Sequence, residues 1–216
     1  VREVSLGNEA PTFFHDLACG PTHRCALGED GSAHCWGENS FDVLGRPPVG
    51  GEDAGAYNRV LDANGNSLVF EQIFAGVSGT CGVTPRGHLH CWGKDYLSAG
   101  RAPFNTPLSP NNRPFWLGEA RASSLEDAER IASVAMGGEH VCAVSDAGKL
   151  FCWGSSEYGE LGSFEESTAT LLGEYIPTPE SSAPLEFASD LVSSIATGLD
   201  FTCSSDRAGA LHCWGD

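Results

Sequence analysis

Basic residues and long apolar runs are scarce in this chain. Only 12 Lys plus Arg stand against 29 Asp plus Glu, so the 216 residues carry a net charge of −17. A surface of this sign repels phosphate backbones and anionic lipid headgroups. No stretch approaches the roughly 18 consecutive apolar residues that read as a candidate membrane-spanning helix. We therefore expect neither a nucleic-acid partner nor membrane insertion.

Helix-forming runs rich in Ala, Leu, Glu and Lys are also lacking, and methionine occurs once. Glycine is abundant instead, at 27 residues, and there are 12 prolines. This balance favours short strands joined by many turns, and so an all-β fold. The sequence starts at Val1 without a basic-then-apolar leader, so we expect a removed signal peptide or an internal piece of a longer polypeptide.

One pattern, C-x9-C-W-G, occurs four times. The cysteines are Cys25 with Cys35, Cys81 with Cys91, Cys142 with Cys152, and Cys203 with Cys213. A glycine stands five residues before each first cysteine and another stands six residues after it. A short apolar run precedes the first glycine, so each copy predicts strand, glycine turn, strand, glycine turn and strand.

The hairpin of each copy predicts a disulfide. In the first copy a turn centred on Asp30 places Cys25 opposite Cys35, and directly opposed residues of an antiparallel pair can be bridged. Buried reduced thiols and a zinc site are the alternatives, although zinc sites normally use ligands two to four residues apart and none are so close here. Cys19 has no cysteine counterpart, since the other copies have Ala75, Met136 and Thr197 at its position, and we expect it to be a buried free thiol.

The copies delimit modules at about 13–45, 69–100, 130–162 and 191–216 of a single propeller segment. Gly- and Pro-rich stretches at 46–68, 101–129 and 163–190 read as insertion loops, which in repeat proteins gather on one rim and often bind partners. Their aromatic residues are the candidate partner-binding side chains: Phe104, Phe115 and Trp116, with Tyr57 in the first insertion. The alternative is that these aromatics fold back to cap the blade.

A calcium loop is suggested and then contradicted by LDANGNSLVF. Asp62, Asn64 and Asn66 alternate as calcium ligands would, but the glycine is one position early and no glutamate follows at the twelfth position. An Asn-Gly turn is the preferred interpretation. We predict no metal and no cofactor.

The repeat extends downstream to Leu-Gly in WGENSFDVLG and WGSSEYGELG, and upstream to a Gly-x-x-His element at Gly20 with His23 and at Gly137 with His140. Gly79 and Phe201 replace this histidine in the other copies. The whole pattern resembles the regulator of chromosome condensation repeat family, and the added cysteines look like its secreted, disulfide-bearing branch. The resemblance implies a β-propeller of about seven blades, so four copies would form part of a longer ring or a larger assembly.

Catalytic signatures are lacking as well. No Ser, His and acid grouping, G-x-S-x-G elbow, Walker loop or H-E-x-x-H string occurs, and the position of His34, His90 and His212 holds Phe151 in the third copy. We expect a non-enzymatic scaffold outside the cytoplasm (extracellular, periplasmic or on the cell surface) that binds a protein partner. The alternatives are an inhibitor of a secreted enzyme such as a β-lactamase and, by fold analogy alone, a guanine-nucleotide exchange factor.

Overall fold

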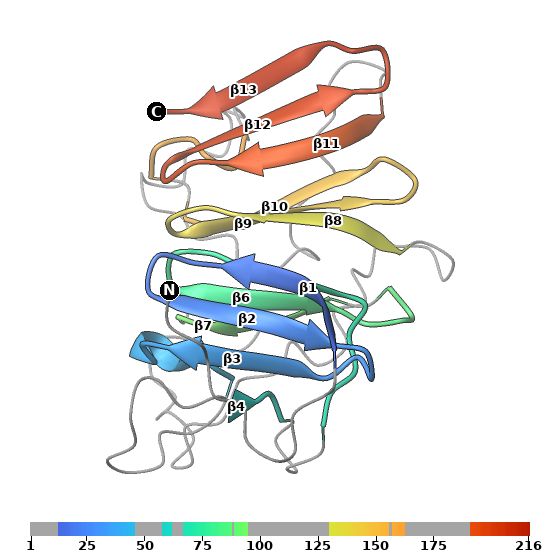
Figure 1. The fold of residues 1–216 in the computed structure, drawn as a ribbon. Helices are drawn as coiled ribbons and strands as arrows, with labels where there is room; N and C mark the ends of the chain where they lie inside the picture. Colours follow the sequence, from blue (N-terminus) through green and yellow to red (C-terminus); the bar gives the residue numbers. More distant parts are fainter. Residues whose placement is uncertain are drawn as a thin grey trace, which may run out of the picture.

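A computed structural model describes residues 13–45, 58–61, 67–87, 89–94, 130–155, 157–162 and 191–216. Within these ranges the regular elements are β-strands, apart from one 3-10 turn, η1 (Ser40–Asp42). The strands form four separate sheets, one for each cysteine repeat (Figure 1). The predicted all-β architecture is confirmed.

Each sheet is a meander of antiparallel strands, which we call blades 1 to 4. Blade 1 contains β1 (Phe14–Cys19), β2 (His23–Gly28), β3 (Ala33–Gly37) and β4 (Asn58–Arg59); blade 2 contains β5 (Gln72–Ala75), β6 (Gly79–Val83) and β7 (Leu89–Gly93); blade 3 contains β8 (Ile131–Met136), β9 (His140–Ser145) and β10 (Leu150–Gly154); blade 4 contains β11 (Val192–Thr197), β12 (Phe201–Asp206) and β13 (Leu211–Gly215). The first strands β1, β5, β8 and β11 contact one another in that order, so the blades follow the chain order in space (Figure 1). β4 lies within the 46–68 stretch, part of which therefore belongs to blade 1.

The hairpin register is the one that the cysteine spacing predicts. In blade 1, Cys25 lies opposite Cys35 and Leu27 lies opposite Ala33. Disulfides join the cysteines of all four hairpins, at Cys25–Cys35, Cys81–Cys91, Cys142–Cys152 and Cys203–Cys213. Each bond is a rung across the two strands that follow the first strand of its blade.

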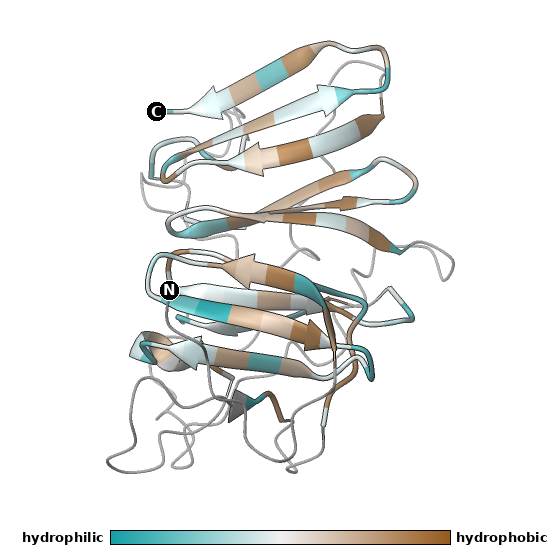
Figure 2. Cartoon of the chain, in the orientation of Figure 1, coloured by the Kyte–Doolittle hydropathy of each residue, from teal (hydrophilic) through white to brown (hydrophobic). Residues whose placement is uncertain are grey.

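The hydrophobic core lies between the blades. Leu27 of blade 1 packs with Ile73 and Trp92 of blade 2, and the same arrangement recurs at the next two interfaces. Apolar positions alternate with polar ones along several strands, which suits sheets packed face to face (Figure 2). The tryptophan that follows the second cysteine therefore buries against the preceding blade, as with Trp153 on blade 2 and Trp214 on blade 3.

The two outer faces of this stack are uncovered by the described residues. Leu17 of blade 1 is 69% exposed, whereas its counterpart Ile73 is 3% exposed. On the other side, Leu211 of blade 4 is 72% exposed, whereas its counterpart Leu150 is 1% exposed. The same repeat positions are thus buried wherever a neighbouring blade covers them.

Cys19 corrects one expectation from the sequence. The structure leaves it unpaired, as predicted, but its side chain is exposed rather than buried. Its counterparts Ala75 and Met136 pack against the core of the preceding blade. Cys19 belongs to blade 1, and no described residue covers that side, so its thiol reaches solvent.

Candidate partner-binding face

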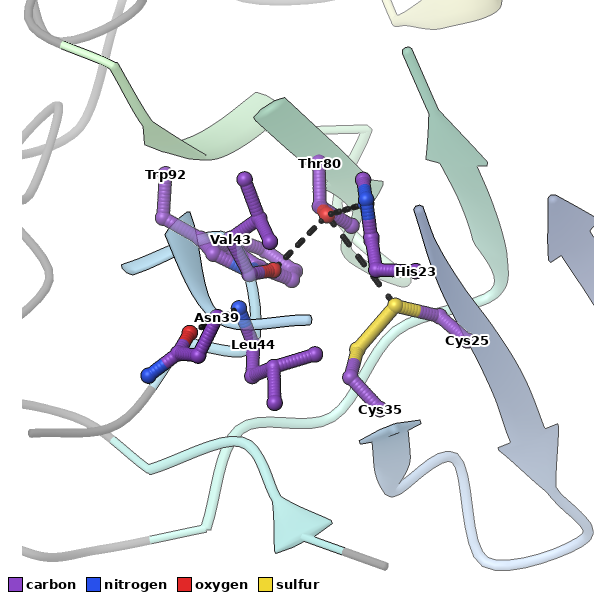
Figure 3. The surroundings of a disulfide bond; sticks show 8 residues. All are labelled: His23, Cys25, Cys35, Asn39, Val43, Leu44, Thr80 and Trp92. Atoms are coloured by element: carbon purple, nitrogen blue, oxygen red, sulfur yellow. Dashed lines mark hydrogen bonds between the residues drawn. A yellow bond between two sulfur atoms is a disulfide. The ribbon is translucent and has the colours of Figure 1, made fainter. Parts of the chain in front are cut away.

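A buried hydrogen-bond network holds the loop after β3 between blades 1 and 2 (Figure 3). The hydroxyl of Thr80 donates to the carbonyl of Val43 at 2.9 Å, and the indole N–H of Trp92 donates to the same carbonyl at 2.8 Å. His23 Nε2 lies 2.8 Å from Thr80 Oγ1. Because the hydroxyl proton is used on the carbonyl, His23 carries its proton on Nε2 and donates it. We call this set of side chains and its carbonyl a latch.

The same latch closes the interface between blades 3 and 4. Thr202 donates to the carbonyl of Glu160 at 3.0 Å, and Trp214 donates to it at 2.8 Å. His140 Nε2 lies 2.9 Å from Thr202 Oγ1. Blades 1 and 3 therefore each contribute a histidine and a loop carbonyl to a latch. Blades 2 and 4 each contribute a threonine and a tryptophan.

The interface between blades 2 and 3 lacks this latch among the described residues. Gly79 stands at the histidine position and Val141 stands at the threonine position. Trp153 is buried, and its indole N–H has no acceptor in the described part of the chain. Among the described residues, apolar packing holds these positions of the interface together.

Both latch histidines are neutral near pH 7. Burial, together with the neighbouring Arg24 charge, lowers the pKa of His23 to about 4. Burial also lowers the pKa of His140, against the opposing effect of Glu160 and Asp200. A neutral, fully buried imidazole that donates to a hydroxyl is a packing element, so these histidines supply no acid or base to an exposed site.

Replacing Trp92 with phenylalanine should cost about 1 kcal/mol more stability than replacing Trp153 with phenylalanine. Both changes remove similar volume from a blade interface, but within the described residues only the Trp92 indole makes a hydrogen bond. Urea unfolding of the two variants, each compared with the wild type, measures the difference. Equal losses would contradict the latch as an energetic feature.

The two latched loops lie at the same end of their blades. There the residue after each Trp-Gly bonds back to the turn between the first two strands, as in Lys94 N–H to Ser78 O at 2.9 Å and Asp216 N–H to Asp200 O at 3.1 Å. We call this end the turn face: the β1–β2, β5–β6, β8–β9 and β11–β12 turns with the segments that follow β3, β7, β10 and β13. It is the left side of the blades in Figure 1, where the C-terminus lies.

Exposed apolar side chains occupy matching repeat positions on the turn face. Phe41 and Tyr158 lie at one position of the loop after the third strand, and they are 56% and 49% exposed. Val77 and Leu199 lie at one position of the turn between the first two strands, and they too are exposed. Phe41 has a φ of 61°, a left-handed conformation that is costly for an aromatic residue and that recurs at binding sites.

Charge separates this face from the opposite one. The exposed carboxylates of the turn face include Glu38, Glu139, Glu157 and Asp216. Among the described residues of this face, Lys94 supplies the basic side chain. At the hairpin-turn end, arginines balance the acids in ion pairs such as Arg59 with Asp30 and Arg130 with Glu71. The turn face is therefore both apolar and anionic.

The partner-binding residues predicted from the sequence, Phe104, Phe115, Trp116 and Tyr57, lie outside the described residues, as do Asp62, Asn64 and Asn66. Sequence reasoning missed Phe41 and Tyr158. The signal was present, because aligning WGENSFDVLG with WGSSEYGELG places the two aromatics in one column. Within the described ranges no group of three His, Cys, Asp or Glu could hold a metal, and no helix is long and apolar enough to cross a membrane.

Comparison with solved structures places the arrangement among known propellers. Human WBSCR16 superposes with a TM-score of 0.73 at 24% identity, over 98% of this chain and 50% of that one. Yeast RCC1 (Prp20), solved bound to Kap60, superposes with a TM-score of 0.70 at 21% identity, over 95% of this chain and 45% of that one. These likenesses support the β-propeller fold.

Sequence comparison agrees. A secretion-regulating guanine nucleotide exchange factor of Mus musculus is 25% identical over 94% of this chain, and the ultraviolet-B receptor UVR8 of Arabidopsis thaliana is 26% identical over 92%. The chain spans 40% of the length of each. The model of the Regulator of chromosome condensation (RCC1) repeat matches residues 14–42 and 131–160, which are the two latch-histidine copies. The first and third repeats of this β-propeller segment thus match the regulator of chromosome condensation repeat.

Proposed function

We propose that this chain is a non-enzymatic protein-binding module that works outside the cytoplasm and receives its partner on the turn face. One observation carries the proposal: Phe41 and Tyr158 stand exposed at the same repeat position, on loops whose carbonyls are fixed by buried latches. Exposed aromatics on a rigid frame suit binding, because little conformational entropy is lost when a partner covers them.

Location outside the cytoplasm is supported by the four disulfides. They bridge eight of the nine cysteines, and such bonds persist in oxidising compartments and are rare in reducing ones. A contribution of the insertions at 46–68, 101–129 and 163–190 to partner binding, predicted from the sequence, stays a prediction. The described chain stops at Lys94 on the turn face and resumes at Arg130 on the opposite face.

Structural neighbours support a protein as the partner. The yeast propeller was crystallised bound to Kap60, and a second structure of Prp20p from Saccharomyces cerevisiae is described with its binding properties to Gsp1p and histones. Those partners belong to those proteins. The general use of such propellers as protein-binding surfaces is what we carry over here.

Site-specific photo-crosslinking tests the proposal. A benzoylphenylalanine replaces Phe41 or Tyr158 on the turn face, or Arg86 or Ala147 at the hairpin turns, in the chain expressed in its native source. We expect both turn-face positions to crosslink the same protein and the hairpin positions to crosslink none. Crosslinks only from Arg86 or Ala147 would place the partner on the other face and refute the assignment.

Guanine-nucleotide exchange is a second candidate, favoured by the relative of that name at 25% identity. A fluorescent nucleotide-release assay with small GTPases of the source organism tests it. Acceleration that depends on Phe41 or Tyr158 would make exchange the consequence of turn-face binding. Release at the uncatalysed rate with every GTPase would leave the binding module without this activity.

A further inference from the structure

The turn face already holds one lysine in a defined way. The ammonium of Lys94 lies 5.7 Å from the centroid of the Phe41 ring, and it also forms an ion pair with Glu139. The aromatic comes from the loop of blade 1, the lysine from the end of blade 2 and the carboxylate from the turn of blade 3. An aromatic face together with a carboxylate is a favourable environment for an ammonium or guanidinium group.

Blades 3 and 4 repeat this arrangement without the lysine. Tyr158 stands at the Phe41 position, while Asp216 stands at the Lys94 position, directly after the Trp-Gly of blade 4. The two segments are held close by the second latch, in which Trp214 donates to the carbonyl of Glu160, two residues after Tyr158. The residue that corresponds to Lys94 therefore carries a carboxylate in place of an ammonium.

The turn face of blade 4 also offers apolar surface for the stem of a long basic side chain. Leu199 is 62% exposed on the β11–β12 turn, and its carbonyl accepts the backbone N–H of Gly138 at 2.8 Å, which fixes the turn against blade 3. Glu157, next to Tyr158, is exposed and adds negative charge. Aliphatic stems of lysine and arginine pack on apolar surface while their heads remain at carboxylates.

Resting on the proposed function, we infer that the partner inserts a lysine or arginine side chain beside Tyr158, with Asp216 as its counter-ion and Leu199 against its stem. We call these three residues the tyrosine site. The cation supplied within the chain by Lys94 at Phe41 is supplied by the partner at Tyr158. The occupant is therefore a protein surface or peptide with an exposed basic residue, in keeping with the acidic charge of this face.

A titration of the full chain with a short peptide tests the inference. The probe is acetyl-Leu-Lys-Leu-amide, and the matched probe carries norleucine in place of lysine, which keeps the stem and removes the charge. Amide chemical shifts of the ¹⁵N-labelled chain report the site. We expect saturable shifts at Tyr158, Leu199 and Asp216 with the lysine peptide, at least fivefold weaker binding of the norleucine peptide, and small changes at Phe41, where Lys94 already lies.

Two charge-reversal variants separate the site from the general acidity of the chain. Asp216→Lys should place an ammonium beside Tyr158 and weaken peptide binding at least tenfold. Glu29→Lys changes the net charge equally at an exposed position of the hairpin-turn end, and it should change the affinity less than twofold. Equal weakening by both variants, or shifts spread evenly over the acidic surface, would overturn the inference.

The outcome is distinguishable from failure of the proposed function. A partner that still crosslinks through the turn face in the Asp216→Lys chain would keep the protein-binding function and overturn the role of the basic residue. The other result is that the lysine peptide binds at the tyrosine site while protein crosslinks form only from the opposite face. This result would sustain the chemistry of the site and overturn the proposed docking of the partner.

Discussion

Replacing both Cys142 and Cys152 with alanine should lower the free energy of unfolding by roughly 3 to 4 kcal/mol. Opening a disulfide loop of this length releases about 2 to 3 kcal/mol of constraint on the unfolded chain in the entropic account. The two sulfurs are also buried between blades 3 and 4, at 0% and 2% exposure, so their removal leaves unfilled space. Urea unfolding monitored by tryptophan fluorescence measures the loss.

The bond between Cys203 and Cys213 is the matched control. It has the same sequence separation of 10, but it lies on blade 4 and Cys213 is exposed. Its replacement by two alanines should cost about 2 to 3 kcal/mol, because the chain-entropy effect remains and the packing effect is small. A larger loss for the blade 4 pair than for Cys142 and Cys152 would contradict the placement of the core between blades.

Acid should destabilise the chain from about pH 6.5 down to about pH 4. Burial lowers the pKa of both His23 and His34 to about 4 in the folded chain, and it lowers that of His140 as well. An unfolded histidine binds its proton near its ordinary pKa of 6.5. In this window the unfolded chain holds more protons, so the free energy of unfolding falls as the pH falls, by up to about 1.4 kcal/mol per pH unit for each histidine.

The variant that tests this replaces both His23 and His140 with glutamine, whose amide N–H can still donate to the threonine hydroxyl. Its stability should fall less steeply than that of the wild type between pH 6.5 and 4.5. Both proteins share the acidic surface, so the relief of its self-repulsion cancels in the comparison. Asp30 and Asp206, whose pKa values are lowered by hydrogen bonds, lose their contribution only below this window. Identical slopes would show that the latch histidines are not held neutral by burial.

The cysteine hairpins were predictable because their geometry is local. Ten residues separate Cys25 from Cys35, a glycine turn lies between them, and antiparallel pairing then places the two opposite each other. The same reasoning gave the register of Leu27 with Ala33. No distant part of the chain is needed to decide these features.

The latches and the turn face could not be obtained in this way. His23 and Thr80 are 57 residues apart, and whether they meet depends on how blade 2 packs against blade 1. Cys19 was expected to be buried because its counterparts lie in apolar runs, yet its exposure follows from the absence of a covering blade within the described residues. Whether a side chain is buried therefore depends on how two blades pack together and not on the sequence of a single repeat.

By itself the sequence determined the repeat, the three strands that every blade shares and the four disulfides, because short-range turn and pairing geometry sets all three. The tertiary structure decided which interfaces carry a latch, which aromatic positions remain exposed and which faces lie open. Those features depend on contacts between residues 37 or more positions apart, which bring a carbonyl, a hydroxyl and an indole into hydrogen-bonding range only after the blades have stacked.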